Sequence, residues 1–144
     1  MKLIKICGHP VLVMSLYLLL LISGRSFGGF YAVYILMGLM GGTTDSILSL
    51  IGLGIMLLGY KLFRKQYHPI KSLLYILGNA VMIYGLVTFF RITKGYNDGT
   101  FEQTIPLISF TIYGVSVFCN LLLSVYLFFS KGTQGKNNSL NVAS

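Results

Sequence analysis

The charged residues of this chain are few and clustered, and the uncharged stretches between them constrain its fold most. The 144 residues include eleven lysines and arginines and three acids. A helix needs about 20 apolar residues to cross a bilayer core, so the spacing predicts an integral membrane protein. One window is shorter than this, and Lys61 can extend it by placing its ammonium group among the headgroups. The five uncharged windows are 6–24, 26–44, 46–60, 72–90 and 103–130.

The composition also indicates a membrane location. Mean hydropathy is +0.78, and charged residues make up 10% of the chain, whereas a soluble domain carries about 25%. The formal net charge is +8, and the basic residues flank apolar windows. There they contact anionic lipid headgroups, so we expect a bilayer with anionic headgroups on its cytoplasmic side as the partner, and no nucleic acid. The predicted headgroup contacts are Lys61, Arg64, Lys65 and Lys71.

Glycine content separates one window from the other four. Window 26–44 holds five glycines, and each costs about 1 kcal/mol relative to alanine inside a helix. We predict a short non-spanning segment over 27–42, with a helix near 30–40, that lies in the outer interface or forms a re-entrant hairpin. The fold class is then an all-α integral membrane protein with four transmembrane helices plus this segment, in a single membrane domain over 1–130. The predicted spans are 9–23, 46–63, 72–90 and 104–129.

Lysine and arginine positions predict the orientation, because short cytoplasmic loops are enriched in both. With four spans and a cytoplasmic N-terminus, eight of these residues lie inside and three outside. The alternative is a fifth span over 26–44. The N-terminus would then lie outside, with seven lysines and arginines inside and four outside. The tail over 131–144 is rich in Gly, Asn and Ser, which predicts a disordered cytoplasmic segment.

Polar side chains inside the predicted spans are the first functional candidates, because a buried polar group must find a partner. No ionisable residue lies in the middle of a span, which argues against a proton-coupled transporter. Asn79 and Asn120 lie at similar depths, and we favour an interhelical hydrogen bond over a polar lining for a solute path. Ser116 and Ser124 flank Asn120 at spacings of four and extend a small, polar stripe.

Two glycine pairs repeat at a spacing of seven, which predicts close approach between helices. They are Gly52 with Gly59, and Gly78 with Gly85.

Four charged residues lie on the predicted outer side, where they form either a solvated rim or a site. We favour the rim, because exposed ion pairs contribute only about 0 to 1 kcal/mol each. The histidines and the two cysteines have no partners at ligand spacing, so we expect no metal or cofactor. There is no nucleophile with a base and an orienting acid, so we expect no enzyme. The predicted rim residues are Asp45, Arg91, Asp98 and Glu102.

Three short motifs link the chain to known sequences. They are His9-Pro10, Ser23-Gly24 and the aromatic and glycine run over 27–31. Together they resemble a group of small bacterial multi-spanning membrane proteins of unassigned function. The resemblance implies a bacterial inner (cytoplasmic) membrane and no particular activity.

These observations favour a non-enzymatic structural or accessory subunit, acting in a homo-oligomer or with a partner in a membrane complex. The alternative is a channel or facilitator for a small neutral or anionic solute, with Asn79 and Asn120 near the path. A holin-like pore former is a third possibility.

Overall fold

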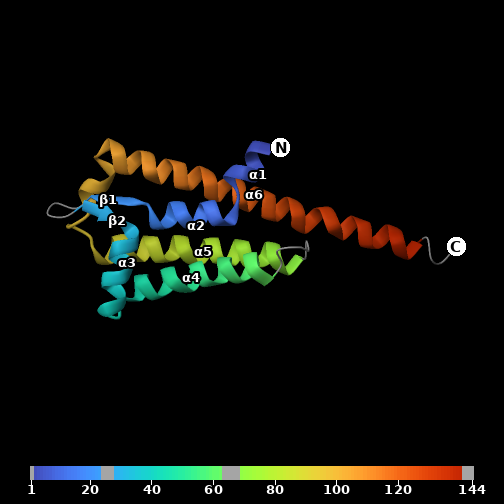
Figure 1. The fold of residues 1–144 in the computed structure, drawn as a ribbon, viewed down its shortest axis with the longest axis horizontal. Helices are drawn as coiled ribbons and strands as arrows, with labels where there is room; N and C mark the ends of the chain where they lie inside the picture. Colours follow the sequence, from blue (N-terminus) through green and yellow to red (C-terminus); the bar gives the residue numbers. More distant parts are fainter. Residues whose placement is uncertain (1, 24–27, 63–68, 141–144) are drawn as a thin grey trace.

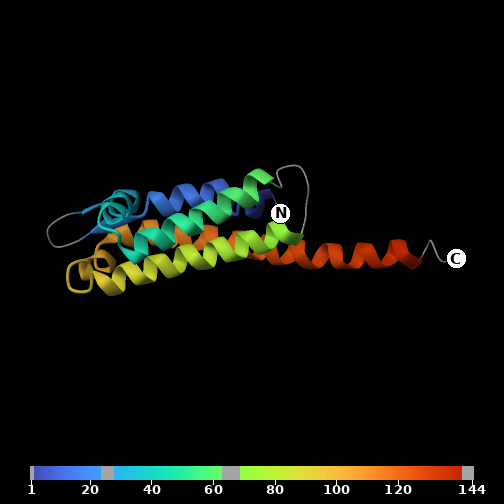
Figure 2. The same cartoon turned by 90° about the horizontal axis from the view of Figure 1, so that it is seen from below.

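The computed structural model describes residues 2–23, 28–62 and 69–140, and within this part the chain is mostly helical. Helices α2, α4, α5 and α6 run side by side along the long axis of the molecule (Figures 1 and 2). The elements in chain order are α1 (Lys2–Cys7), α2 (Pro10–Leu18), β1 (Leu21–Ser23), β2 (Gly28–Phe30), α3 (Tyr31–Met40), α4 (Thr44–Leu62), α5 (Pro69–Ile92), the 3-10 helix η1 (Asp98–Phe101) and α6 (Thr104–Leu140).

Three helices contain a segment long and apolar enough to cross a membrane, and the bounds of these segments differ from three of the predicted spans by at most three residues. Helix α5 begins at Pro69, whose missing amide hydrogen costs nothing in a first helical turn. Helix α3 is the shorter apolar helix, so the predicted short helix near 30–40 is confirmed. The three long segments are Thr44–Leu62, Pro69–Ile92 and Thr104–Phe129.

The first predicted span, 9–23, is not one continuous helix. Helix α2 ends at Leu18, and β1 follows it. Strand β1 pairs antiparallel with β2, with Leu21 opposite Phe30 and Ser23 opposite Gly28. The helical prediction was wrong beyond Leu18 because an uninterrupted apolar run does not distinguish a strand from a helix.

Side chains of distant elements support the β1–β2 hairpin. The Leu21 amide donates to Ser109 Oγ of α6 at 3.2 Å. Thr100 Oγ1 of η1 accepts from the Ser23 amide at 3.2 Å and donates to the Ser23 carbonyl at 2.9 Å. Strand β1 pairs with β2 along one edge. Along its other edge, these two hydroxyl groups form the hydrogen bonds that a neighbouring strand would otherwise provide.

Helices α4 and α5 pack closely through small residues. A Cβ atom added at Gly52 would lie 2.6 Å from Met82 Cγ, and one added at Gly78 would lie 2.6 Å from Met56 Cγ. Each glycine therefore receives a methionine from the facing helix, which confirms the close approach predicted from the glycine spacing.

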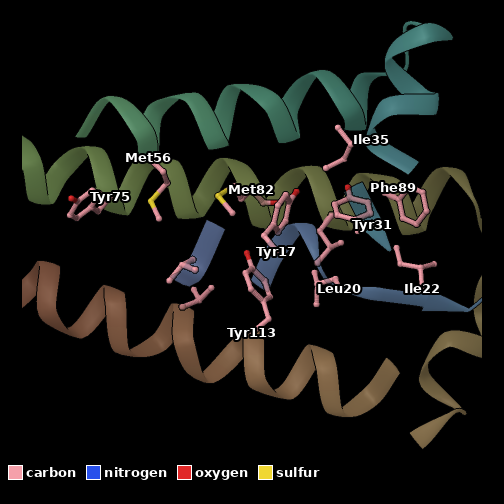
Figure 3. Packing of buried hydrophobic residues seen from close by; sticks show 13 residues of the cluster. Tyr17, Leu20, Ile22, Tyr31, Ile35, Met56, Tyr75, Met82, Phe89 and Tyr113 are labelled. Atoms are coloured by element: carbon pink, nitrogen blue, oxygen red, sulfur yellow. The ribbon is translucent and has the colours of Figure 1, made fainter. Parts of the chain in front are cut away.

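The core lies where one face of α2 packs against α4, α5 and α6 (Figure 3). Although α2 has only nine residues, its Val13 and Tyr17 have no exposed surface. Met56, Met82 and Tyr113 bring the other three helices into the same cluster. Even the shortest of these four helices therefore contributes fully buried side chains to the core.

Helix α6 continues to Leu140, beyond the ends of the other helices (Figure 1). The prediction of a disordered tail was therefore wrong over 131–140, where the backbone is helical. Residues 141–144 lie outside the described part of the chain. A helix that has already formed extends at little cost, because nucleation is the expensive step. A polar composition alone therefore did not locate the end of the helix.

The two ends of the bundle differ in charge. The hairpin end comprises β1, β2, α3, the start of α4 and η1, and the basic end comprises α1, the end of α4 and the start of α5 (Figures 1 and 2). All three acids of the chain belong to the hairpin end, since Asp45 is in the first turn of α4, Asp98 begins η1 and Glu102 follows it. Lys5 and Lys71 are at the basic end.

Candidate functional site

The structure brings together the two amides that the sequence places at similar depth. Asn79 Nδ2 donates to Asn120 Oδ1 at 2.8 Å and to the Tyr75 carbonyl at 2.9 Å. Asn120 Nδ2 donates to the Gly8 carbonyl at 2.6 Å. Asn79 is 0% exposed and Asn120 is 2% exposed. This chain of hydrogen bonds links α5 and α6 to the break between α1 and α2.

The break itself explains why polar side chains of α6 lie here. Where α1 ends, its last carbonyls lose their helical partners, and such groups need a replacement in an apolar environment. Ser116 Oγ donates to the Cys7 carbonyl at 2.6 Å, and Asn120 Nδ2 donates to the next carbonyl in the chain, that of Gly8. Gly8 lies directly against α6, since a Cβ atom there would be 2.8 Å from the carbonyl carbon of Cys119. Two members of the predicted polar stripe therefore bind backbone.

A second polar cluster, the hydroxyl cluster of Tyr17, Tyr31 and Ser49, was not predicted. Tyr17 Oη lies 2.8 Å from Ser49 Oγ and 2.9 Å from the Met82 carbonyl oxygen. Ser49 Oγ also lies 3.1 Å from Tyr31 Oη and 2.8 Å from the Asp45 carbonyl oxygen. Three hydroxyl hydrogens serve these four contacts, so at most three of them are hydrogen bonds at any moment. The cluster joins α2, α3, α4 and α5.

Tyrosines inside the uncharged windows could have predicted this cluster. A buried tyrosine usually requires a partner for its hydroxyl, and Tyr17 and Tyr31 both lie in uncharged windows. Tyr113 of α6 points toward Tyr17, with ring centroids 5.6 Å apart (Figure 3). Its buried hydroxyl, like Asn79 Oδ1, has no hydrogen-bond partner within the described ranges.

The four predicted rim residues do not form one exposed group. Asp45 is only 5% exposed and accepts a hydrogen bond from Ser46 Oγ at 3.3 Å. The rim prediction was wrong for Asp45, because α3 packs on the first turns of α4. Arg91 and Glu102 are exposed, and the side chain of Asp98 is outside the described residues. Asp45 instead places its carboxylate at the positive end of the α4 dipole.

A pocket of about 510 Å³ lies at the basic end, which we call the basic pocket. The break between α1 and α2 forms one side, and α4, α5 and α6 form the others. Its lining includes Asn120 and Ser124 of the predicted polar stripe, so this stripe reaches from the helix break into the pocket. Its other polar lining includes Lys5, His9, Tyr60 and Lys71.

Of the four predicted headgroup residues, Lys71 lines the basic pocket. Its ammonium nitrogen is 5.9 Å from the ring centre of Tyr75, which also lines the pocket. Lys61 is exposed and follows Tyr60 in the chain. The other two, Arg64 and Lys65, lie outside the described part. The structure therefore places one predicted headgroup residue in a defined cavity.

Comparison of the chain with protein-family models, with characterised proteins and with solved structures finds no match. In the part of the chain that the structure describes, no three residues among His, Cys, Asp and Glu are grouped so that they could hold a metal ion. Function must therefore be inferred from the contacts and burial of this chain's own residues.

Proposed function

We propose that this chain is a small integral membrane protein of the bacterial cytoplasmic membrane that acts as a non-enzymatic structural or accessory subunit. The three long apolar helices support membrane insertion. In this proposal α1, α2 and β1 together make a fourth crossing, so that the N- and C-termini are both cytoplasmic. The basic end would face the cytoplasm, as the distribution of lysine and arginine favours.

One observation carries the proposal: several buried polar side chains bind the chain's own backbone. Ser116 and Asn120 hold the carbonyls of Cys7 and Gly8, and Tyr17 donates to the carbonyl of Met82. Groups committed in this way stabilise the fold and are not available as nucleophile, base or proton carrier. A role through assembly fits such an interior better than a role through chemistry.

The outward surface of α6 fits the same proposal. Large apolar side chains are exposed along it, including Ile112, Val115 and Phe118. Gly114, among them, has no atom of another element within 4 Å of an added Cβ. Such a face suits lipid or the helix of another membrane subunit, because small residues allow close approach.

Cross-linking in native membranes, followed by purification of the full chain in mild detergent, tests the proposal. We expect a stoichiometric complex, either with itself or with another membrane protein. Gly114→Leu adds bulk to the outward face of α6, and Gly54→Leu is the matched control on α4, where an added Cβ also meets nothing within 4 Å. A monodisperse monomer without cross-linked partners would contradict the proposal.

A channel or facilitator for a small neutral or anionic solute is the second candidate. One observation favours it: Asn120 lines the basic pocket, and Asn79 donates a hydrogen bond to it from behind the wall. We expect solute flux into proteoliposomes to fall when Asn79→Leu and Asn120→Leu are combined. Unchanged flux in a variant that melts like the wild type would exclude this candidate.

A further inference from the structure

We infer that the basic pocket is a binding site for the phosphate group of an anionic phospholipid. Its volume of about 510 Å³ lies within the range of about 300 to 1,000 Å³ that is usual for ligand sites. Residues of α1, α2, α4, α5 and α6 line it, so the ligand would contact segments that are far apart in the sequence. The inference rests on the membrane insertion proposed above.

The charge of the pocket calls for an anion. Lys5 and Lys71 both line it, and every aspartate and glutamate of the chain belongs to the hairpin end. The described lining thus includes two lysines and no aspartate or glutamate. Lys71 is also in the first turn of α5, where the helix dipole adds positive potential.

The pocket also offers hydrogen-bond donors suited to phosphate oxygens. Its lining residues include Tyr60, Ser124 and Tyr126, whose side chains carry hydroxyl groups, and phosphate oxygens are strong acceptors. The ring of His9 makes an edge contact with the ring of Tyr60, with centroids 5.7 Å apart, while Lys71 lies over the ring of Tyr75. Aromatic contacts thus hold two of the nitrogen-bearing side chains in the wall.

The apolar part of the lining points to a lipid rather than a free phosphate. Pro10, Leu123 and Leu127 form part of the wall, and they suit the glycerol and upper acyl region of a phospholipid. The pocket lies near the ends of α4 and α5, where headgroups would surround an inserted bundle. Basic pockets between transmembrane helices are known as sites for anionic headgroups. A free phosphate would use only the polar side of this cavity.

Native mass spectrometry of the full chain in detergent tests this inference directly. The probes are phosphatidylglycerol, which is anionic, and phosphatidylcholine with the same acyl chains, which has no net charge. We expect phosphatidylglycerol to bind at least tenfold more tightly. We expect the double variant Lys5→Gln and Lys71→Gln to lose most of that preference, because each lysine near the surface contributes attraction to an anionic headgroup. Equal binding of the two lipids by the wild type would overturn the inference.

Two single variants separate the pocket from general surface attraction. Lys94→Gln removes a charge near the hairpin end and should leave lipid affinity unchanged. Lys61→Gln removes a charge from the basic end without touching the pocket lining and should change affinity by less than twofold. If Lys61→Gln weakens binding as much as Lys71→Gln does, the attraction is diffuse and the inferred site is wrong.

Glycerol 3-phosphate and inorganic phosphate distinguish the two sources of the phosphate group. We expect neither to displace phosphatidylglycerol at millimolar concentration, and displacement would assign the pocket to a soluble phosphate compound instead. If the double variant does not fold, Lys71→Arg, which keeps the charge, should retain the preference for the anionic lipid, and its loss would count against the site. Loss of lipid preference leaves the proposed subunit role untouched, and a monomeric protein leaves the lipid site untouched.

Discussion

At the scale of single residues, Asn120 connects three features of the molecule. Its amide accepts from Asn79, donates to the carbonyl of Gly8 and forms part of the basic pocket. A buried donor or acceptor that loses its partner costs about 1 to 3 kcal/mol. Replacement of Asn120 therefore affects two other residues as well as itself.

We expect Asn120→Ala to lower the free energy of unfolding by about 1 to 3 kcal/mol, because the Gly8 carbonyl loses its side-chain partner and Asn79 Nδ2 keeps only the Tyr75 carbonyl. Combined with Asn79→Ala in a double-mutant cycle, it should show a coupling energy of about 0.6 to 1.7 kcal/mol. Unfolding in mixed micelles measures both quantities. Thr111→Ala is the control, because the exposed Thr111 hydroxyl donates to the Leu107 carbonyl of its own helix. Zero coupling would mean that the two amides do not interact.

The hydroxyl cluster gives a second prediction. Tyr17→Phe keeps the ring but removes the hydroxyl that contacts Ser49 and the Met82 carbonyl, so we expect a loss of about 1 kcal/mol of unfolding free energy. Tyr84→Phe is the matched control, since Tyr84 is 60% exposed. Thermal unfolding of both variants in the same detergent makes the comparison, and equal stability of the two would show that the cluster contributes nothing.

At the scale of elements, long uncharged windows predicted α4, α5 and the apolar part of α6 closely, because bilayer thickness sets the length of a spanning helix. The same rule failed for 9–23, where hydroxyl groups of Thr100 and Ser109 support a strand. Those partners lie more than 70 residues away in the sequence, so no local pattern could reveal them. The amide pair was predictable from depth alone, whereas the basic pocket depended on where the helix break lies.

The contact between the helix break and α6 also yields a prediction. Gly8→Ala should destabilise the protein by about 1 to 3 kcal/mol, because the added Cβ would lie 2.8 to 2.9 Å from backbone atoms of Cys119 and Asn120. Gly114→Ala on α6 meets nothing within 4 Å and should be neutral or stabilising by up to about 1 kcal/mol. Melting temperatures in a common detergent compare the two. Equal effects would show that the close approach at Gly8 is unimportant.

At the scale of the whole molecule, the start of α1 and the end of α4 lie at the same end of the bundle (Figure 1). This arrangement agrees better with four membrane crossings than with five, because only the four-crossing topology places the N-terminus and the end of α4 on the same side. Both topologies place the end of α4 inside and Glu102 outside, so only the N-terminus distinguishes them.

Cysteine labelling of cells checks this topology in a background where Cys7 and Cys119 are alanine. With a membrane-impermeant maleimide, we expect Glu102→Cys to react in intact cells, and Leu3→Cys and Lys61→Cys to react only after permeabilisation. All three positions are exposed in the structure. Reaction of Leu3→Cys in intact cells would favour five crossings, and inaccessibility of Glu102→Cys would reverse the orientation.

The helix break has a consequence for how the protein is made. The carbonyls of Cys7 and Gly8 find their partners on Ser116 and Asn120, which are 109 and 112 residues later in the chain. The segment around Gly8 therefore cannot complete its hydrogen bonding until α6 has been synthesised. We expect a chain truncated before α6 to leave both carbonyls without these partners and to be degraded faster in cells than the full chain.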